Sequence, residues 1–118
     1  MKIKEKFIGK IPCIYLNGNL MGGDAAVELQ DKIRGLLNDG YKQIVIDLKD
    51  VKWMNSTGLG ALMACLTTVR NNDGDLRLAN VTDKIESLLQ ITKLITVFQT
   101  FETDERAAVS FDLNASVN

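Results

Sequence analysis

The amino-acid sequence predicts a single α/β domain in the order ββαβαβαβα, with helices packed on a mostly parallel mixed sheet. Apolar, β-branched runs alternate with segments of helical periodicity, which is typical of a parallel sheet covered by helices. The first two strands are separated only by Gly9–Lys10, so we expect an N-terminal antiparallel hairpin at the sheet edge. The length of 118 residues is close to the commonest domain size, which predicts one domain over residues 1–118.

The hairpin is expected to comprise residues 2–9 and 12–20. Alternation of apolar and charged residues directs Ile3 and Phe7 inward and the lysines outward. Pro12 has no backbone N–H to donate, so it belongs at a strand start or on an edge.

A glycine-containing loop at 18–23 leads to an amphipathic helix over 25–38. Asp24 is the expected N-cap, and Gly40 suits a left-handed C-cap. The residues predicted to face the core recur at helical spacing, and they are Ala26, Leu29, Ile33, Leu36 and Leu37.

The run 43–48, QIVIDL, is almost entirely apolar and predicts a central strand covered on both faces. Residues 49–54 are expected to carry the chain out of that strand. The next helix should begin at Ser56 or Thr57 and end at 71–75, NNDGD. Its apolar stripe consists of Leu59, Leu62, Met63, Leu66 and Val69.

The remaining elements follow the same alternation. Residues 76–81 predict a strand, and Thr82–Asp83 should cap a helix that carries Ile85, Leu88 and Leu89. Residues 95–101 predict the last strand, and a terminal helix should follow Thr103. We expect the last residues, 113–118, to fray.

Composition excludes several classes of function. The chain has no histidine, which excludes Ser–His–Asp and Cys–His catalysis, and its two cysteines are too few for a Cys₄ zinc site. We therefore expect no cofactor and no metal, and read Cys13 and Cys65 as small buried apolar residues. A net charge of −1 without a basic stripe disfavours nucleic-acid binding. No apolar run is long enough to span a membrane and no signal peptide is recognisable, so a cytoplasmic location is expected.

The segment from Trp53 to Leu66, WMNSTGLGALMACL, is the most informative part of the chain. It places Ser56 and two glycines, Gly58 and Gly60, where a helix should begin. Ser56 is expected to cap that helix, and the helix dipole there tolerates an added anion such as phosphate. The residues alone also allow a plain cap followed by glycines that let strand and helix pack closely.

The run DVKWMNSTGLGALM resembles the signature of STAS domains, specifically of the bacterial anti-sigma factor antagonists. That family reads hydrophobic–Met–Asp–Ser–Ser/Thr–Gly–Leu–Gly between a strand and a helix. The matching residues here are Met54, Ser56, Thr57, Gly58, Leu59 and Gly60. The likeness extends over almost the whole chain, including IYLNGNL, QIVIDLKDVKWM and LRLANVTDKIESLLQITKL.

The resemblance implies a phosphorylation-controlled protein-binding switch and no enzymatic activity. In the family, an anti-sigma factor that is also a serine kinase phosphorylates the serine, which here is Ser56, with Thr57 as the second candidate. The unphosphorylated form binds that kinase and frees the sigma factor, and a PP2C-type phosphatase resets the switch. The expected partner surface combines the loop at 18–23 with the turn at 55–60, and its named members are Met21, Gly22, Asn55, Ser56, Thr57, Gly58, Leu59 and Gly60. Leu20, Met21 and Trp53 are apolar residues near those turns that could belong to the core or to the interface.

One position departs from the family pattern, because Asn55 stands where the family has Asp. This leaves two further alternatives open. The chain could be a STAS interaction or scaffold domain that is not phosphorylated, or a small enzyme or ligand-binding α/β domain that uses the turn as an anion site.

Overall fold

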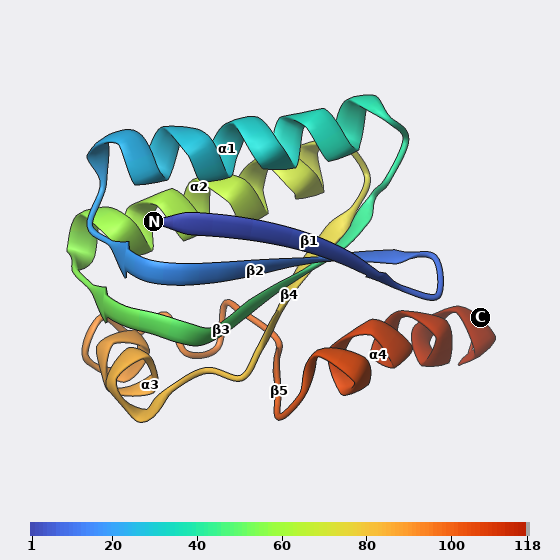
Figure 1. Ribbon diagram of the computed structural model, residues 1–118. Helices are drawn as coiled ribbons and strands as arrows, with labels where there is room; N and C mark the ends of the chain where they lie inside the picture. The colour runs from blue at the N-terminus through green and yellow to red at the C-terminus, as the bar shows by residue number, and fades with distance from the viewer. Residues whose placement is uncertain (118) are drawn as a thin grey trace.

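The computed structural model describes the backbone of residues 1–117 and the side chains of residues 1–112, so the predicted fraying of 113–118 lies outside the side chains described. Five strands form one mixed sheet in the order β1-β2-β3-β4-β5 (Figure 1). The first pair is antiparallel and the other three pairs are parallel. The predicted fold class is therefore confirmed, and the elements are β1 (Lys2–Ile8), β2 (Ile11–Leu20), α1 (Gly23–Asn38), β3 (Gln43–Met54), α2 (Ser56–Asn71), β4 (Asp75–Ala79), α3 (Asp83–Ile91), β5 (Thr100–Phe101) and α4 (Asp104–Val117).

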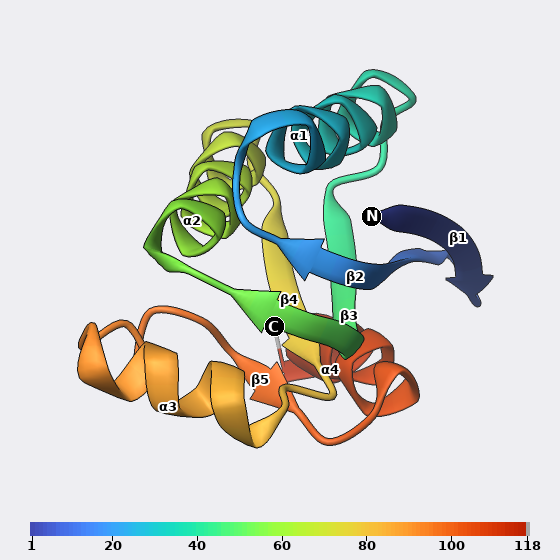
Figure 2. The same ribbon diagram turned by 60° about the vertical axis from the view of Figure 1, so that its left-hand side comes forward.

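The sheet separates two apolar layers. Helices α1 and α2 lie together on one face, α4 lies on the other, and α3 lies beside the end of β3 (Figure 2). The larger core joins α1, α2 and α3 to the sheet through residues such as Leu29, Leu62 and Ile85. The smaller core joins α4 to the opposite face through Ala107 and Phe111. Both faces of β3 are thus covered, which explains its nearly continuous apolar run.

Strands β3 and β5 differ most in length from the sequence-based prediction, whereas the ends of the other strands differ by one or two residues. Strand β3 continues to Met54 instead of ending at residue 48, because the long β2 keeps pairing with it as far as Leu20 opposite Met54. Strand β5 is reduced to Thr100–Phe101 instead of spanning 95–101. The amides of Leu94 and Ile95 both donate to the carbonyl of Leu89, so the chain there closes the end of α3 and does not pair with β4.

The predicted helix ends are partly confirmed. Gly40, which follows the C-cap residue Asp39 of α1, has a φ of 94° in the left-handed region, as predicted for this helix end. The Thr82 hydroxyl accepts from the amide of Ile85 at 3.4 Å, as predicted for α3. The prediction for Asp24 was wrong, since α1 begins at Gly23, two residues before the predicted start, and its N-cap Gly22 offers no side-chain acceptor.

The predictions for the hairpin and the thiols are also only partly confirmed. Ile3 packs against the larger core, but Phe7 is 45% exposed because it lies on the edge strand, where its ring meets Tyr41 at 5.2 Å. Both cysteines are free and buried, as predicted. Burial raises the pKa of the Cys13 thiol to about 11 and that of Cys65 to about 12, so neither is a ready nucleophile.

Candidate functional site

The candidate site lies at the carboxyl end of the sheet, where β3 passes into α2. The loop between β2 and α1 reaches the same place, so two segments far apart in the sequence meet where β3 passes into α2 (Figure 1). In open α/β sheets, the crevice beyond the carboxyl ends of parallel strands is the usual place for binding. The position of the WMNSTGLG segment therefore agrees with a functional role.

Asn55, and not Ser56, is the N-cap of α2. The Oδ1 atom of Asn55 accepts from the amide of Gly58 at 2.8 Å, and its backbone carbonyl accepts from Leu59 at 2.9 Å. The expectation that Ser56 caps the helix was wrong, because Asn is at least as good a cap and occupies the position directly after β3. Ser56 is instead the first helical residue, and its side chain is exposed.

Gly58 holds the start of α2 against the end of β2. A Cβ atom at this position would lie only 1.8 Å from the carbonyl oxygen of Leu20, which leaves no space for any side chain. Gly60 differs, since nothing lies within 4 Å of the place its Cβ would occupy. Gly58 therefore permits close packing of helix on strand, whereas Gly60 leaves an open surface.

The loop after β2 packs directly against Thr57. A Cβ at Gly22 would lie 2.5 Å from the Cγ2 atom of Thr57, and Gly22 has a φ of 98°, which other residues rarely adopt. These two features fix the distance between the loop and the helix start. The structure therefore brings together Gly22 and the Ser56 turn.

The predicted surface residues differ in exposure. Ser56, Thr57 and Gly60 are exposed, Met21 is 47% exposed, and Asn55 and Gly22 are half-buried. Gly58 is buried and Leu59 is only 2% exposed, so the Leu59 side chain belongs to the core and presents nothing to a partner. The pattern of α2 already suggested this, because Leu59 is also the first residue of its apolar stripe.

The other two apolar residues near the turns, Leu20 and Trp53, also differ in exposure. Leu20 is fully buried, whereas Trp53 is 57% exposed. The ammonium of Lys84, on α3, lies 4.0 Å from the centre of the Trp53 ring. Sequence reasoning missed this contact with α3, because it depends on how β3 and β4 align in the sheet and no local pattern reports that.

The electrostatics at the start of α2 favour an anion. The first turn of this helix contains no acidic residue, whereas α1 and α3 each carry at least one there. The first amides of a helix have no partner within it, and together they amount to about half a positive charge. An anion attached at Ser56 would therefore be stabilised by about 0.3–1 kcal/mol.

Two other features are absent from the described part of the chain. There, no group of three His, Cys, Asp or Glu side chains is placed to hold a metal ion. None of the described helices combines the length and apolar character that crossing a membrane requires.

Comparison with known proteins agrees with this geometry. The sequence model of the STAS domain family matches residues 2–107. The anti-sigma-B factor antagonist of Staphylococcus aureus is 35% identical over a 78-residue alignment, and the match covers 63% of this chain and 72% of that protein. The matched region of the family model covers both segments that form the site.

Solved structures show the same fold. The protein TM1081 of Thermotoga maritima superimposes with a TM-score of 0.81 at 23% identity, covering 92% of each chain. The phosphorylated form of the Bacillus cell-fate determinant SpoIIAA superimposes with a TM-score of 0.71 at 19% identity, covering 93% of this chain and 99% of that one. From the family match and its architecture, this chain belongs to the STAS domain family.

Proposed function

We propose that this chain is an anti-sigma factor antagonist whose binding surface is controlled by phosphorylation of Ser56. In the unphosphorylated state it binds an anti-sigma factor that is also a serine kinase, and the sigma factor is released. Phosphorylation ends this binding, and a PP2C-type phosphatase restores it. The chain is then a substrate and a binding partner and has no catalytic role of its own.

The observation that carries the proposal is that Ser56 is exposed on a fixed backbone. Asn55 caps the helix through the amide of Gly58, and Gly58 packs against the carbonyl of Leu20, so the turn is held without using Ser56. A kinase can therefore reach the hydroxyl without first unfolding anything. The relatives support the same role, since one is named an anti-sigma-B factor antagonist and SpoIIAA has a phosphorylated form.

Phosphorylation at this position changes the surface and leaves the fold in place. The phosphate adds about −1.5 to −2 charges at neutral pH. At the start of α2 these charges meet the positive end of the helix dipole and are tolerated. At a protein interface the same group is bulky and costly to desolvate, so binding is lost.

Asn55 in place of the family's Asp is compatible with this proposal. The Oδ1 atom of Asn55 makes the capping hydrogen bond to Gly58, which is the structural task that a carboxylate oxygen would perform there. The substitution removes a negative charge beside Ser56 and keeps the turn. The acceptor serine therefore keeps its position.

The proposal is tested by intact-mass measurement after incubation with the candidate anti-sigma factor kinase and ATP. We expect one added phosphate on the wild-type chain and on Thr57→Val, and none on Ser56→Ala. Subsequent treatment with a PP2C-type phosphatase should restore the original mass. Phosphorylation of Ser56→Ala, or no mass change in the wild type with any such kinase, would contradict the assignment.

The alternative is a STAS interaction domain that binds its partner constitutively. The observation that favours it is the uncharged Asn55, because a carboxylate beside the serine could assist phosphoryl transfer. This alternative predicts that Ser56→Asp leaves partner binding unchanged in a pull-down.

A further inference from the structure

A groove between the end of β3 and α3 lies next to the Ser56 turn. It has a volume of about 370 Å³, and the residues around it include Lys52, Trp53, Met54, Lys84, Leu88 and Ile91. Figure 1 shows α3 and the start of α2 on either side of the end of β3, at the same end of the molecule. The lining of the groove reaches Met54, which is two positions before Ser56 in the chain.

The groove exposes more apolar surface than folding requires. Ile91 is 79% exposed and Trp53 is 57% exposed, which are unusually high values for large apolar side chains. Tryptophan is one of the residue types enriched at the energetic centres of protein interfaces. An exposed tryptophan in a hollow lined by Leu88 and Ile91 is therefore a natural anchor point for a partner's side chain.

The charge of the groove is positive. Lys52 and Lys84 lie on it, and no carboxylate is among its described lining residues. Within the residues whose side chains are described, neither lysine forms an ion pair, although several other basic residues do. Lys84 instead lies over the Trp53 ring, so its ammonium remains available at the rim.

We propose that this groove is a second docking site for the same partner, and that it receives an acidic segment carrying an apolar side chain. The apolar side chain packs on Trp53 and Ile91, and the carboxylates pair with Lys52 and Lys84. A stable interface buries about 800 Å² on each partner, so a protein that covers the Ser56 turn must extend over neighbouring surface. This inference rests on the proposed function, because the partner is the anti-sigma factor kinase.

The single tryptophan allows a direct test. Labelling the chain with 5-fluorotryptophan gives one ¹⁹F NMR signal, from Trp53, and the unlabelled partner contributes none. The probe is the candidate anti-sigma factor kinase without ATP. We expect the signal to shift or broaden as the kinase is added.

Charge and apolar variants then separate the two sites. Lys84→Glu and Ile91→Ser should each weaken kinase binding about tenfold or more, since interfacial charge reversal and loss of an apolar anchor both act directly on affinity. Lys10→Glu, at the hairpin turn, and Val109→Ser, on α4, change charge and exposed apolar surface elsewhere and should not weaken it. The helix dipole favours a glutamate in the first turn of α3, so Lys84→Glu should fold normally.

The outcomes distinguish this inference from the proposed function. One outcome refutes the docking groove alone. The kinase then binds and phosphorylates the wild-type chain, but the Trp53 signal does not change, and Lys84→Glu and Ile91→Ser bind the kinase as tightly as wild type. If the Trp53 signal shifts when the concentration of this chain is raised without kinase, the groove binds a second copy of the chain, and the docking proposal is also refuted. If the kinase neither binds nor phosphorylates the wild-type chain, both proposals fail.

Discussion

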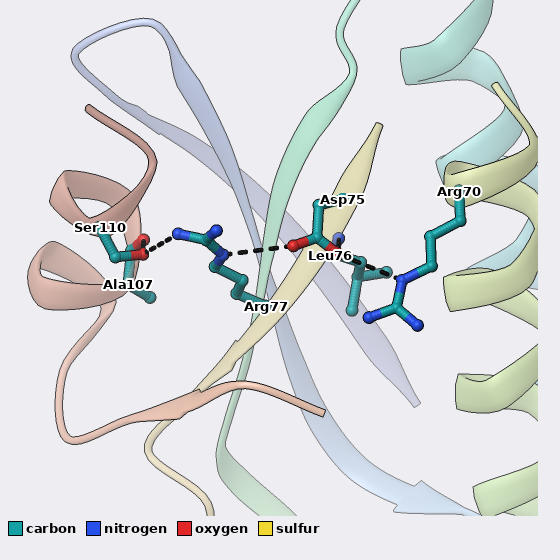
Figure 3. Close-up of polar contacts among 6 residues, drawn as sticks. All are labelled: Arg70, Asp75, Leu76, Arg77, Ala107 and Ser110. Carbon is teal, nitrogen blue, oxygen red and sulfur yellow. Dashed lines mark hydrogen bonds and ion pairs between the residues drawn. The ribbon is translucent and has the colours of Figure 1, made fainter. Parts of the chain in front are cut away.

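Polar side chains under α4 are buried and hydrogen-bonded, whereas Ser56 at the start of α2 is exposed. Under α4, Arg77 and Asp47 are only 3% exposed, and every polar side-chain atom that is buried among the described residues has a hydrogen-bond partner. Arg77 donates to Ser110 on one side and to Asp75 on the other (Figure 3). At the start of α2, Ser56 is exposed, and the cap is made by Asn55 instead.

The difference shows which polar groups hold the fold and which are free for chemistry. The network under α4 connects that helix to β4 and, through Asp75, to Arg70 on α2 (Figure 3). Removing a member of such a network leaves a buried group without its partner, which is costly. Ser56 belongs to no buried network, so its modification should have little effect on the free energy of unfolding.

The largest expected effect concerns the packing that fixes the Ser56 turn. Gly58→Ala should lower the free energy of unfolding by more than about 3 kcal/mol, because its Cβ would collide with the backbone of Leu20. Gly60→Ala, two residues on and in open space, should raise it by about 0.5–1 kcal/mol by favouring the helix. Urea denaturation measures both, and equal effects would show that Gly58 does not fix the turn.

The next effect tests the buried network. Arg77→Ala should lower the free energy of unfolding by about 2–4 kcal/mol. Ser110 loses one of its two hydrogen bonds, Asp75 loses an ion-pair partner, and the Phe111 ring loses a cation 4.0 Å from its centre. Arg106→Ala removes an exposed pair with Glu102 and should cost less than about 0.5 kcal/mol. Urea denaturation of both variants measures the two losses in free energy of unfolding. Similar losses would contradict the greater importance of the buried network.

A third test uses the pH dependence of stability. Tyr15 donates to Asp104 at 2.6 Å, and this bond holds the pKa of the Asp104 carboxyl below its usual range. The folded pKa is therefore lower than the unfolded value of about 3.9, so this stabilisation is complete above that pH and is lost as pH falls further. Tyr15→Phe should remove about 1 kcal/mol at neutral pH and flatten the acid limb of the stability curve.

Tyr41→Phe is the matched control for that test. Tyr41 is half-buried and has no side-chain hydrogen bond to the described residues, so its variant should keep the wild-type pH profile. An unchanged profile in Tyr15→Phe would mean that the bond to Asp104 does not stabilise the fold.

The cap of α2 gives a smaller effect. Asn55→Ala should cost about 1 kcal/mol, the usual value for losing a side-chain N-cap. Asn55→Asp keeps an acceptor oxygen and adds a charge that the helix dipole favours, so it should be neutral or stabilising by about 0.3–1 kcal/mol. Thermal or urea unfolding that ranks Asn55→Asp below Asn55→Ala in stability would contradict the capping role.

The sequence was sufficient for elements whose signals are local. The helical stripes of α1 and α2, the Thr82 cap and the left-handed Gly40 all depend on residues within a few positions of one another. The length of β3 and the shortness of β5 depend instead on which strands they pair with, and this information is distributed along the chain.

The candidate site shows the same division. The exposed hydroxyl at the start of α2 was predictable, but the capping role was assigned one residue too late, because Asn55 and Ser56 are both good caps. The burial of Leu59 could have been predicted from its place in the helical stripe. The groove between Trp53 and α3 could not, because only the aligned sheet places Lys84 above that ring.

The most direct test compares Ser56→Asp with Ser56→Asn, which has the same shape without the charge. Ser56→Asp should keep the wild-type free energy of unfolding within about 0.5 kcal/mol, because the site is exposed and the dipole tolerates the charge. Its affinity for the anti-sigma factor kinase should fall at least tenfold, while Ser56→Asn binds nearly as well as wild type. Equal binding by both variants, or unfolding of Ser56→Asp, would contradict a switch that acts on the surface alone.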